Sequence, residues 1–120
     1  MNLVRVEMSW PPSGNRRLAK SAKTKRMFLQ KPYKVWKEAE SLKVNSKRLK
    51  PFGDSVRLSV TLFAHEPNRI KRDLDNLFKA PLDVLRDAGV YGDDSQIDRL
   101  RAVRMGVQKP GKITITIEEV

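Results

Sequence analysis

Two aspartates separated by one residue, Asp73 and Asp75, begin the part of the chain that gathers its negative charge. Residues 73–98 contain seven Asp but only Lys79 and Arg86, a net charge of −5, whereas the whole chain carries +11. Carboxylate oxygens are the hard ligands that Mg²⁺ prefers, and a bound Mg²⁺ ion neutralises charge that develops on a phosphate during cleavage. The pattern indicates a candidate site for metal-assisted cleavage of a phosphodiester.

Cationic side chains flank the aspartate pair on both sides. Immediately before it stand Arg69, Lys71 and Arg72, which would bring a phosphate next to the two carboxylates. Lys79 follows Asp75 by four residues, which is one helical turn on the same face. Its ammonium is therefore a candidate for contact with the scissile phosphate or the leaving oxygen.

Each of these residues also has an ordinary structural interpretation. Asp is a preferred N-cap, and carboxylates in a first turn offset the positive end of the helix dipole; for an isolated Asp-x-Asp this is the commoner role. Lys79 and Asp75 also have the spacing of an i,i+4 ion pair, which on spacing alone is the favoured interpretation. The cations beside the pair are what favour the catalytic interpretation.

A second pair of carboxylates, Asp93 and Asp94, lies in a Gly-Asp-Asp-Ser segment that also has the composition of a plain turn. Between the two pairs we expect a helix in which residues 76–88 rise by about 20 Å. Asp94 reaches the first pair only if the chain doubles back along the helix or the helix kinks; otherwise its metal partners belong to another subunit. For Asp83 and Asp87 we expect a solvated or ion-paired face of this helix, in preference to the alternative that Asp83 reaches the site by contacting a metal ligand.

Composition limits the other possibilities. The chain has no cysteine and a single histidine, His65, so we expect neither a disulfide nor a zinc site. Its 120 residues predict one domain over residues 1–120. No apolar run approaches the roughly 20 residues of a membrane span, and the N-terminus lacks the apolar core of a signal peptide. We therefore expect a cytoplasmic protein with no membrane association and no small-molecule cofactor.

Positive charge is concentrated in residues 1–50, which contain fourteen Lys and Arg against three acids. With a pI near 10.3, this favours a polyanionic partner, because Lys and Arg gain affinity by displacing counterions from phosphates. A flexible basic loop is predicted over residues 16–26, either as a solvated charge run or as a segment that orders on nucleic acid. Its cations are Arg16, Arg17, Lys20, Lys23, Lys25 and Arg26.

Hydrophobic periodicity predicts the elements that must position these groups. In the first half, alternation over residues 4–9 indicates a half-buried strand, and helical spacing indicates an amphipathic helix over residues 32–44. The expected apolar stripe of this helix is Val35, Trp36, Ala39 and Leu42. We interpret Trp36 as a core anchor in preference to a base-stacking platform, because it lies on that stripe.

In the second half, alternation over residues 56–64 predicts the clearest strand. A helix follows over residues 73–88, which we expect to bend at Pro81 and to end before Gly89. Its expected apolar stripe is Leu74, Leu77, Phe78, Leu82 and Leu85.

The last two predicted strands, residues 97–105 and 113–119, are expected to pair as an antiparallel hairpin. The order of elements is then strand, basic loop, helix, strand, helix, strand, strand. This order predicts a small α+β fold, with a mixed, mostly antiparallel sheet of about four strands covered by two helices.

Several spaced motifs occur together in the second half of the chain. They are Arg72-Asp73-Leu74-Asp75-Asn76-Leu77 with Lys79 downstream, then Asp83, the Ala88-Gly89 and Asp93-Asp94 segments, and Gly111 before Ile113-Thr114-Ile115-Thr116. The pattern resembles the RusA-type Holliday-junction resolvases of bacteria and their prophages, and Pro11-Pro12-Ser13 with Asn15 is similar to that family's early turn. The likeness is specific over residues 66–119 and thin over residues 16–54.

The resemblance implies a homodimeric endonuclease, dependent on Mg²⁺ or Mn²⁺, that binds four-way DNA junctions and nicks two opposed strands symmetrically in recombination and repair. By motif position it implies that Asp73, Asp75 and Asp94 are catalytic and hold the metal. It assigns the essential lysine to Lys79 and leaves Asp93 as an adjacent candidate ligand. The residues expected to bind DNA are Arg16, Arg17, Lys20, Lys23, Lys25, Arg26, Arg69, Lys71 and Arg72.

Two other functions fit the sequence. A non-catalytic nucleic-acid-binding protein would use its Asp residues as helix caps and surface counter-charges, and composition alone favours it. A nuclease for flaps or other branched DNA would use the same catalytic residues on a differently shaped substrate. Metal-dependent nicking of a four-way junction separates these possibilities.

Overall fold

The computed structural model describes residues 3–12, 18–20, 27–29 and 31–120, with side chains described outside the two short segments at 18–20 and 27–29. Its elements in chain order are β1 (Leu3–Ser9), β2 (Leu18–Lys20), β3 (Met27–Leu29), α1 (Lys31–Ser46), β4 (Leu58–His65), the 3₁₀ turn η2 (Leu74–Leu77), α2 (Lys79–Asp87), the 3₁₀ turn η3 (Asp94–Gln96), β5 (Ile97–Arg104) and β6 (Lys112–Glu119). Among these residues no helix is both long and apolar enough to cross a membrane.

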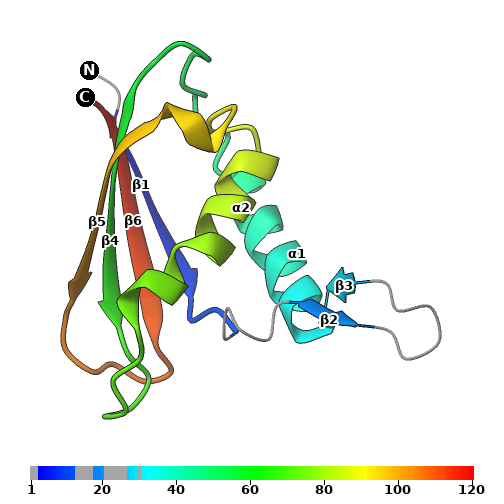
Figure 1. Ribbon diagram of the computed structural model, residues 1–120, viewed down its shortest axis with the longest axis vertical. Helices are drawn as coiled ribbons and strands as arrows, with labels where there is room; N and C mark the ends of the chain where they lie inside the picture. Colours follow the sequence, from blue (N-terminus) through cyan, green and yellow to red (C-terminus); the bar gives the residue numbers. More distant parts are fainter. Residues whose placement is uncertain (1–2, 13–17, 21–26, 30) are drawn as a thin grey trace.

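Four strands form the main sheet in the order β1-β6-β4-β5. β6 pairs antiparallel with β1 and with β4, whereas β4 and β5 run parallel. Both helices cover the same face of this sheet (Figure 1). The prediction of an α+β fold with a mixed, mostly antiparallel sheet and two helices is confirmed.

The expected hairpin of the last two strands is wrong. β5 lies at the edge beside β4, and β6 lies between β1 and β4. Ile113, Ile115 and Ile117 of β6 are fully buried, which suits a central strand, whereas β5 exposes residues 98–101, which suits an edge. The connection from β4 through α2 to β5 is a helical crossover, and such crossovers join parallel strands.

The core lies between the sheet and the helices. β1 alternates exposed and buried residues along its whole length, with Val4, Val6 and Met8 inward. Val60 and Leu62 of β4 are fully buried in the same core. The predicted strands over residues 4–9 and 56–64 are therefore confirmed, with β4 beginning at Leu58.

Helix α1 confirms the prediction for residues 32–44, but its buried side is different from the one expected. The buried residues are Tyr33, Trp36, Glu40 and Val44. Val35 and Leu42 are 56% and 72% exposed. Glu40 is buried because its Oε1 accepts a hydrogen bond from the Ser9 N–H at 2.9 Å. Trp36 is a core residue, as predicted, and its Nε1 donates to the Ser9 carbonyl at 3.2 Å.

The predicted helix over residues 73–88 is two elements, η2 and α2, and not one helix with a bend. Pro81 lies in the first turn of α2, where its missing N–H has no intrahelical partner to lose, so it does not kink the helix. The end was predicted correctly. Gly89 has φ of 79° and follows the C-cap Ala88, the position that favours glycine.

Part of the predicted basic loop is a short ribbon. Residues 18–20 pair antiparallel with residues 27–29, beyond the start of α1 and away from the main sheet (Figure 1). The prediction of a loop is wrong for this part, because strand pairing with residues beyond 26 is not visible in local composition. Lys20 lies in β2, and the remaining cations of the segment lie outside the described residues: Arg16, Arg17, Lys23, Lys25 and Arg26.

Candidate functional site

Buried Glu66 fixes the segment that leaves β4 and carries the first aspartate pair. Its Oε2 accepts the backbone N–H of Arg72 at 2.8 Å, and its Oε1 accepts Nε of Arg104, the last residue of β5, at 2.7 Å. Burial alone would raise the pKa of Glu66, but these hydrogen bonds and the two guanidinium charges outweigh it and lower the pKa. The ends of two parallel strands thus hold the residue before Asp73.

Both carboxylates of the first pair are exposed and uncommitted. Asp73 precedes η2 in an extended conformation, φ −66° and ψ 122°, but its side chain makes no capping hydrogen bond. Within the described part of the chain, neither Asp73 nor Asp75 has a hydrogen bond or ion pair through its side chain. Capping therefore does not account for Asp73, and both carboxylates are available to a ligand.

The three cations before the pair have different surroundings. Arg72 is held in place: its Nη1 donates to the Ile70 carbonyl at 2.9 Å, and its guanidinium lies 5.6 Å from the centre of the Trp10 ring. Arg69 and Lys71 are exposed. Only these two are free to move toward an incoming phosphate.

A cleft of about 150 Å³ adjoins Asp73. It is lined by Trp10, Pro11, Pro12, Arg72, Asp73, Asn76 and Leu77. The early Pro-Pro turn and the aspartate motif, more than sixty residues apart in sequence, therefore meet at one place. Gly111 completes this packing: its φ is 92°, and a Cβ there would lie 3.0 Å from Pro67 and 3.1 Å from Trp10.

Lys79 is not paired with Asp75. Its Nζ lies 3.3 Å from Oδ1 of Asp83, and its side chain is 51% exposed. The expected i,i+4 pair with Asp75 does not form because η2 ends at Leu77 and α2 begins at Lys79, so the two residues do not share one regular α-helix. Lys79 keeps an exposed ammonium one turn beyond the aspartate pair.

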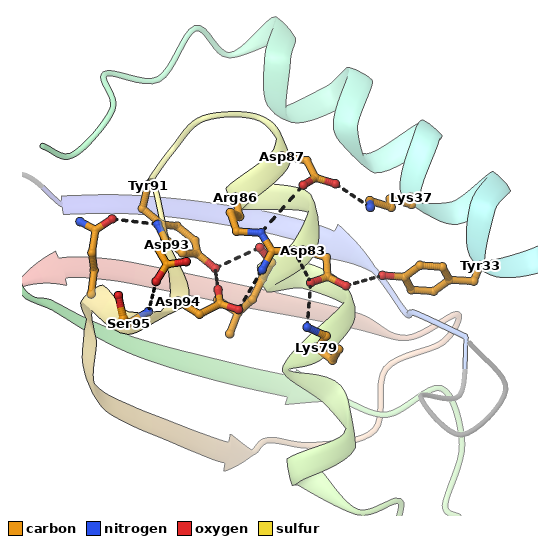
Figure 2. Close-up of polar contacts among 12 residues, drawn as sticks. Tyr33, Lys37, Lys79, Asp83, Arg86, Asp87, Tyr91, Asp93, Asp94 and Ser95 are labelled. Carbon is orange, nitrogen blue, oxygen red and sulfur yellow. Dashed lines mark hydrogen bonds and ion pairs between the residues drawn. The ribbon is translucent and has the colours of Figure 1, made fainter. Parts of the chain in front are cut away.

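Asp94 folds back onto the last turn of α2 (Figure 2). Its Oδ2 accepts Nη1 of Arg86 at 2.9 Å, and its Oδ1 accepts the Tyr91 hydroxyl at 2.7 Å. Burial, followed by this hydrogen bond, raises the pKa of the Tyr91 phenol, so the hydroxyl remains a donor. Asp94 is thus oriented by two donors and half-exposed.

Asp93 has a structural role in the same turn. Its Oδ2 accepts the Ser95 N–H at 3.0 Å, and it forms a capping box with Gln96. Hydrogen bonding to the Ser95 side chain, followed by the bond from the Ser95 N–H, lowers the pKa of Asp93. Gln96 is buried, and its Nε2 donates to the carbonyls of Gly53 at 2.8 Å and Val56 at 3.0 Å. Gln96 was missed in the sequence, although the Asp-x-x-Gln spacing is the signal of a capping box.

A single chain does not bring the predicted metal ligands together. In the parts of the chain that the structure describes, no group of three or more Asp, Glu or His side chains is placed to hold one metal ion. Asp75 precedes α2 and Asp94 lies against its last turn, and a helix of nine residues rises about 13 Å. Asp83 and Asp87 were expected to be solvated or ion-paired, and both are ion-paired.

Uncommitted carboxylates beside exposed cations, on an α+β fold with a net charge of +11, are typical of one class of protein, an enzyme of the nuclease type. The model of the family described as endodeoxyribonuclease RusA matches residues 9–118, and this chain belongs to that family. The resemblance in the motifs is confirmed.

Curated relatives match the chain over nearly its whole length. The crossover junction endodeoxyribonuclease rusA of Enterobacteria phage 82 is 32% identical over 119 residues, which cover 99% of this chain and 97% of the relative. Crossover junction endodeoxyribonucleases RusA from Shigella sonnei (strain Ss046) and Escherichia coli (strain K12) show the same identity and coverage.

Proposed function

We propose that this protein is a metal-dependent endonuclease that resolves four-way DNA junctions by paired, symmetric nicks. The observation that carries the proposal is the pair of exposed, uncommitted carboxylates, Asp73 and Asp75, between exposed cations. The names of the relatives, crossover junction endodeoxyribonucleases, support the substrate. Membership of the family supports the reaction.

Asp73 and Asp75 would hold Mg²⁺ or Mn²⁺ through carboxylate oxygens, the donor type these ions prefer. The bound ion would supply charge neutralisation at the phosphate and a lower pKa for the attacking water. Lys79 contributes a positive charge near the phosphate or the departing 3′ oxygen. Arg69 and Lys71 bind neighbouring phosphates, since both are exposed.

The enzyme acts as a homodimer in which Asp94 of one subunit completes the metal site of the other. In one chain Asp94 lies against Arg86, at the opposite end of α2 from the first pair. A two-fold axis that sets two α2 helices antiparallel would place each Asp94 near the partner's first pair. The two resulting sites would match the symmetry of a four-way junction.

The test is cleavage of a synthetic four-way junction in Mg²⁺, beside a linear duplex and an EDTA control. We expect wild-type protein to nick only the junction and Asp75→Asn to bind it without nicking. Glu38→Gln is the matched control, because it also removes one carboxylate charge but lies exposed on α1. Equal cutting by Asp75→Asn would overturn the assignment.

Two other outcomes identify the alternatives. Wild-type protein that binds the junction but never cuts it in Mg²⁺ or Mn²⁺ would be a non-catalytic binder. Equal cutting of flaps and junctions would indicate a nuclease for branched DNA in general.

A mixture of Asp75→Asn and Asp94→Asn subunits tests the composite site. In a mixed dimer of this kind, the unsubstituted Asp75 of one subunit and the unsubstituted Asp94 of the other form one intact site, whereas neither variant alone contains an intact site.

A further inference from the structure

We infer that Asp83 and Arg86 are positioning residues that hold Lys79 and Asp94 as one unit along α2. The inference rests on the proposed function, in which Lys79 acts at the phosphate and Asp94 at the metal. It adds two residues to which the family motif assigns no role in the reaction.

The four side chains form a continuous chain of ion pairs, drawn in Figure 2. Lys79 Nζ lies 3.3 Å from Asp83 Oδ1. The same oxygen lies 3.2 Å from Arg86 Nη2. Arg86 Nη1 lies 2.9 Å from Asp94 Oδ2. Spacings of four and three residues put the three α2 members on one face of that helix.

Asp83 is the most firmly held residue in this series of ion pairs. It is 7% exposed, and its Oδ2 also accepts the hydroxyl of Tyr33 in α1 at 2.9 Å. A buried carboxylate that left these donors would be an uncompensated charge in a low-dielectric environment, so its position is strongly determined. Lys79 and Arg86 are therefore both oriented by the same carboxylate.

Arg86 connects Asp83 to Asp94 and so orients the Asp94 carboxylate. The guanidinium uses one terminal nitrogen for Asp83 and the other for Asp94, which its planar shape allows and a lysine ammonium on a flexible stem does not reproduce. The hydroxyl of Tyr91 holds the other oxygen of Asp94 at 2.7 Å. A carboxylate has about four acceptor positions, so Asp94 keeps lone pairs for a metal while both donors stay in place.

The charges of the positioning pair cancel. Asp83 balances Arg86, so the pair orients Asp94 without adding net charge next to the metal ligand. Removing Asp83 leaves the Arg86 guanidinium with Asp94 and the more distant Asp87, at 3.9 Å, as its ion-pair partners. Removing Arg86 leaves Asp94 with the Tyr91 hydroxyl as its donor and without the guanidinium. Both changes should weaken metal binding, since the loss of such outer hydrogen-bond partners typically costs 10–100-fold in metal affinity.

The experiment measures Mn²⁺ affinity by calorimetry and junction cleavage by kcat and KM, on the full-length protein. We expect Arg86→Gln to raise the Mn²⁺ dissociation constant about 10-fold or more, and Arg86→Lys not to restore it. Asp83→Asn should lower kcat by about 10-fold or more with little change in KM. Because the residues act in series, the double variant should be no worse than the worse single variant.

Lys37→Gln is the matched control. It breaks an ion pair between the two helices, Lys37 to Asp87 at 2.6 Å, and leaves the contacts of Asp83 with Lys79, Arg86 and Tyr33 in place. We expect wild-type kcat and Mn²⁺ affinity from this variant. An equal loss in Lys37→Gln would show that Asp83 acts only through helix packing and would overturn the inference. Arg86 is one-third exposed, so its variants keep the test decisive if Asp83→Asn does not fold.

The same measurements separate this inference from the proposed function. If wild-type protein neither binds Mn²⁺ nor cuts the junction, the proposed function fails. If wild type does both and Asp75→Asn does not cut, while Arg86→Gln and Asp83→Asn match wild type, only the positioning role is overturned.

Discussion

The backbone N–H of Arg72 donates a 2.8 Å hydrogen bond to Oε2 of Glu66. Glu66 directly follows β4, and its other oxygen is bound by Arg104 at the end of β5. This single buried carboxylate therefore joins the ends of two parallel strands to the segment that carries Asp73. We expect the geometry of the first aspartate pair to depend on it.

Glu66→Gln should destabilise the protein by roughly 2 kcal/mol, because an amide cannot accept hydrogen bonds at both positions and leaves a buried donor or acceptor unsatisfied. Urea unfolding measures the free-energy difference. Junction cleavage should fall as well, since Asp73 loses its anchor. Glu38→Gln, the same change at an exposed site, should stay within about 0.5 kcal/mol of wild type.

The lowered pKa of Glu66 also predicts a pH dependence. Its contribution to stability is fully present above the unfolded-state pKa, about 4.3, and is lost as the pH falls through the lower pKa of the folded state. Between pH 5 and pH 2, urea unfolding should show a shallower loss of stability for Glu66→Gln than for wild type. Parallel curves for the two proteins would contradict this prediction.

Gln96→Ala should cost about 2 kcal/mol, because the buried amide bonds two carbonyls and accepts the N–H groups of Gly92 and Asp93. Asp94 lies in the same turn, so cleavage should fall more than the lost stability explains at a temperature where the variant is folded. Gln108→Ala, at an exposed position, is the control for the substitution type. Equal activity of the two variants would show that the turn does not position Asp94.

Two glycines should respond differently to the same substitution. Gly89→Ala places a side chain at φ of 79° in open space, which should cost about 1 kcal/mol of backbone strain. Gly111→Ala adds contacts of 3.0 Å with Pro67 and 3.1 Å with Trp10, so its cost should be clearly larger. Thermal unfolding of both variants checks the order. Only Gly111→Ala should also reduce cleavage, since Trp10 lines the cleft beside Asp73.

The sequence by itself predicted most of the strands and singled out the first aspartate pair as a candidate site. The alternation of Val4, Val6 and Met8 is a local signal of one buried strand face, and it was confirmed. Asp73 and Asp75 belong to one short motif, and their availability depends on few distant contacts. Family membership was equally visible, because each motif is a short run of residues and the order and spacing of the motifs along the chain can be read directly.

The buried polar residues depended on the tertiary structure. Hydrophobic periodicity predicts that Glu40, Asp83 and Gln96 are exposed, because their side chains are polar. Each is buried because another element supplies its hydrogen-bond partners. Tyr33, and not the predicted Val35, lies on the buried side of α1, where its hydroxyl donates to Asp83. Periodicity reports which residues are apolar, and it does not report where distant donors and acceptors lie.

Strand order and the position of Asp94 were also decided only in three dimensions. Strand pairing depends on residues that are distant in the sequence. β6 lies between β1 and β4, where Ile113, Ile115 and Ile117 are fully buried, and β5 lies at the edge of the sheet. The sequence showed that Asp94 must either double back along the helix or act in another subunit. The tertiary structure brings it back only as far as Arg86, because the Tyr91 hydroxyl and the Arg86 guanidinium hold it there.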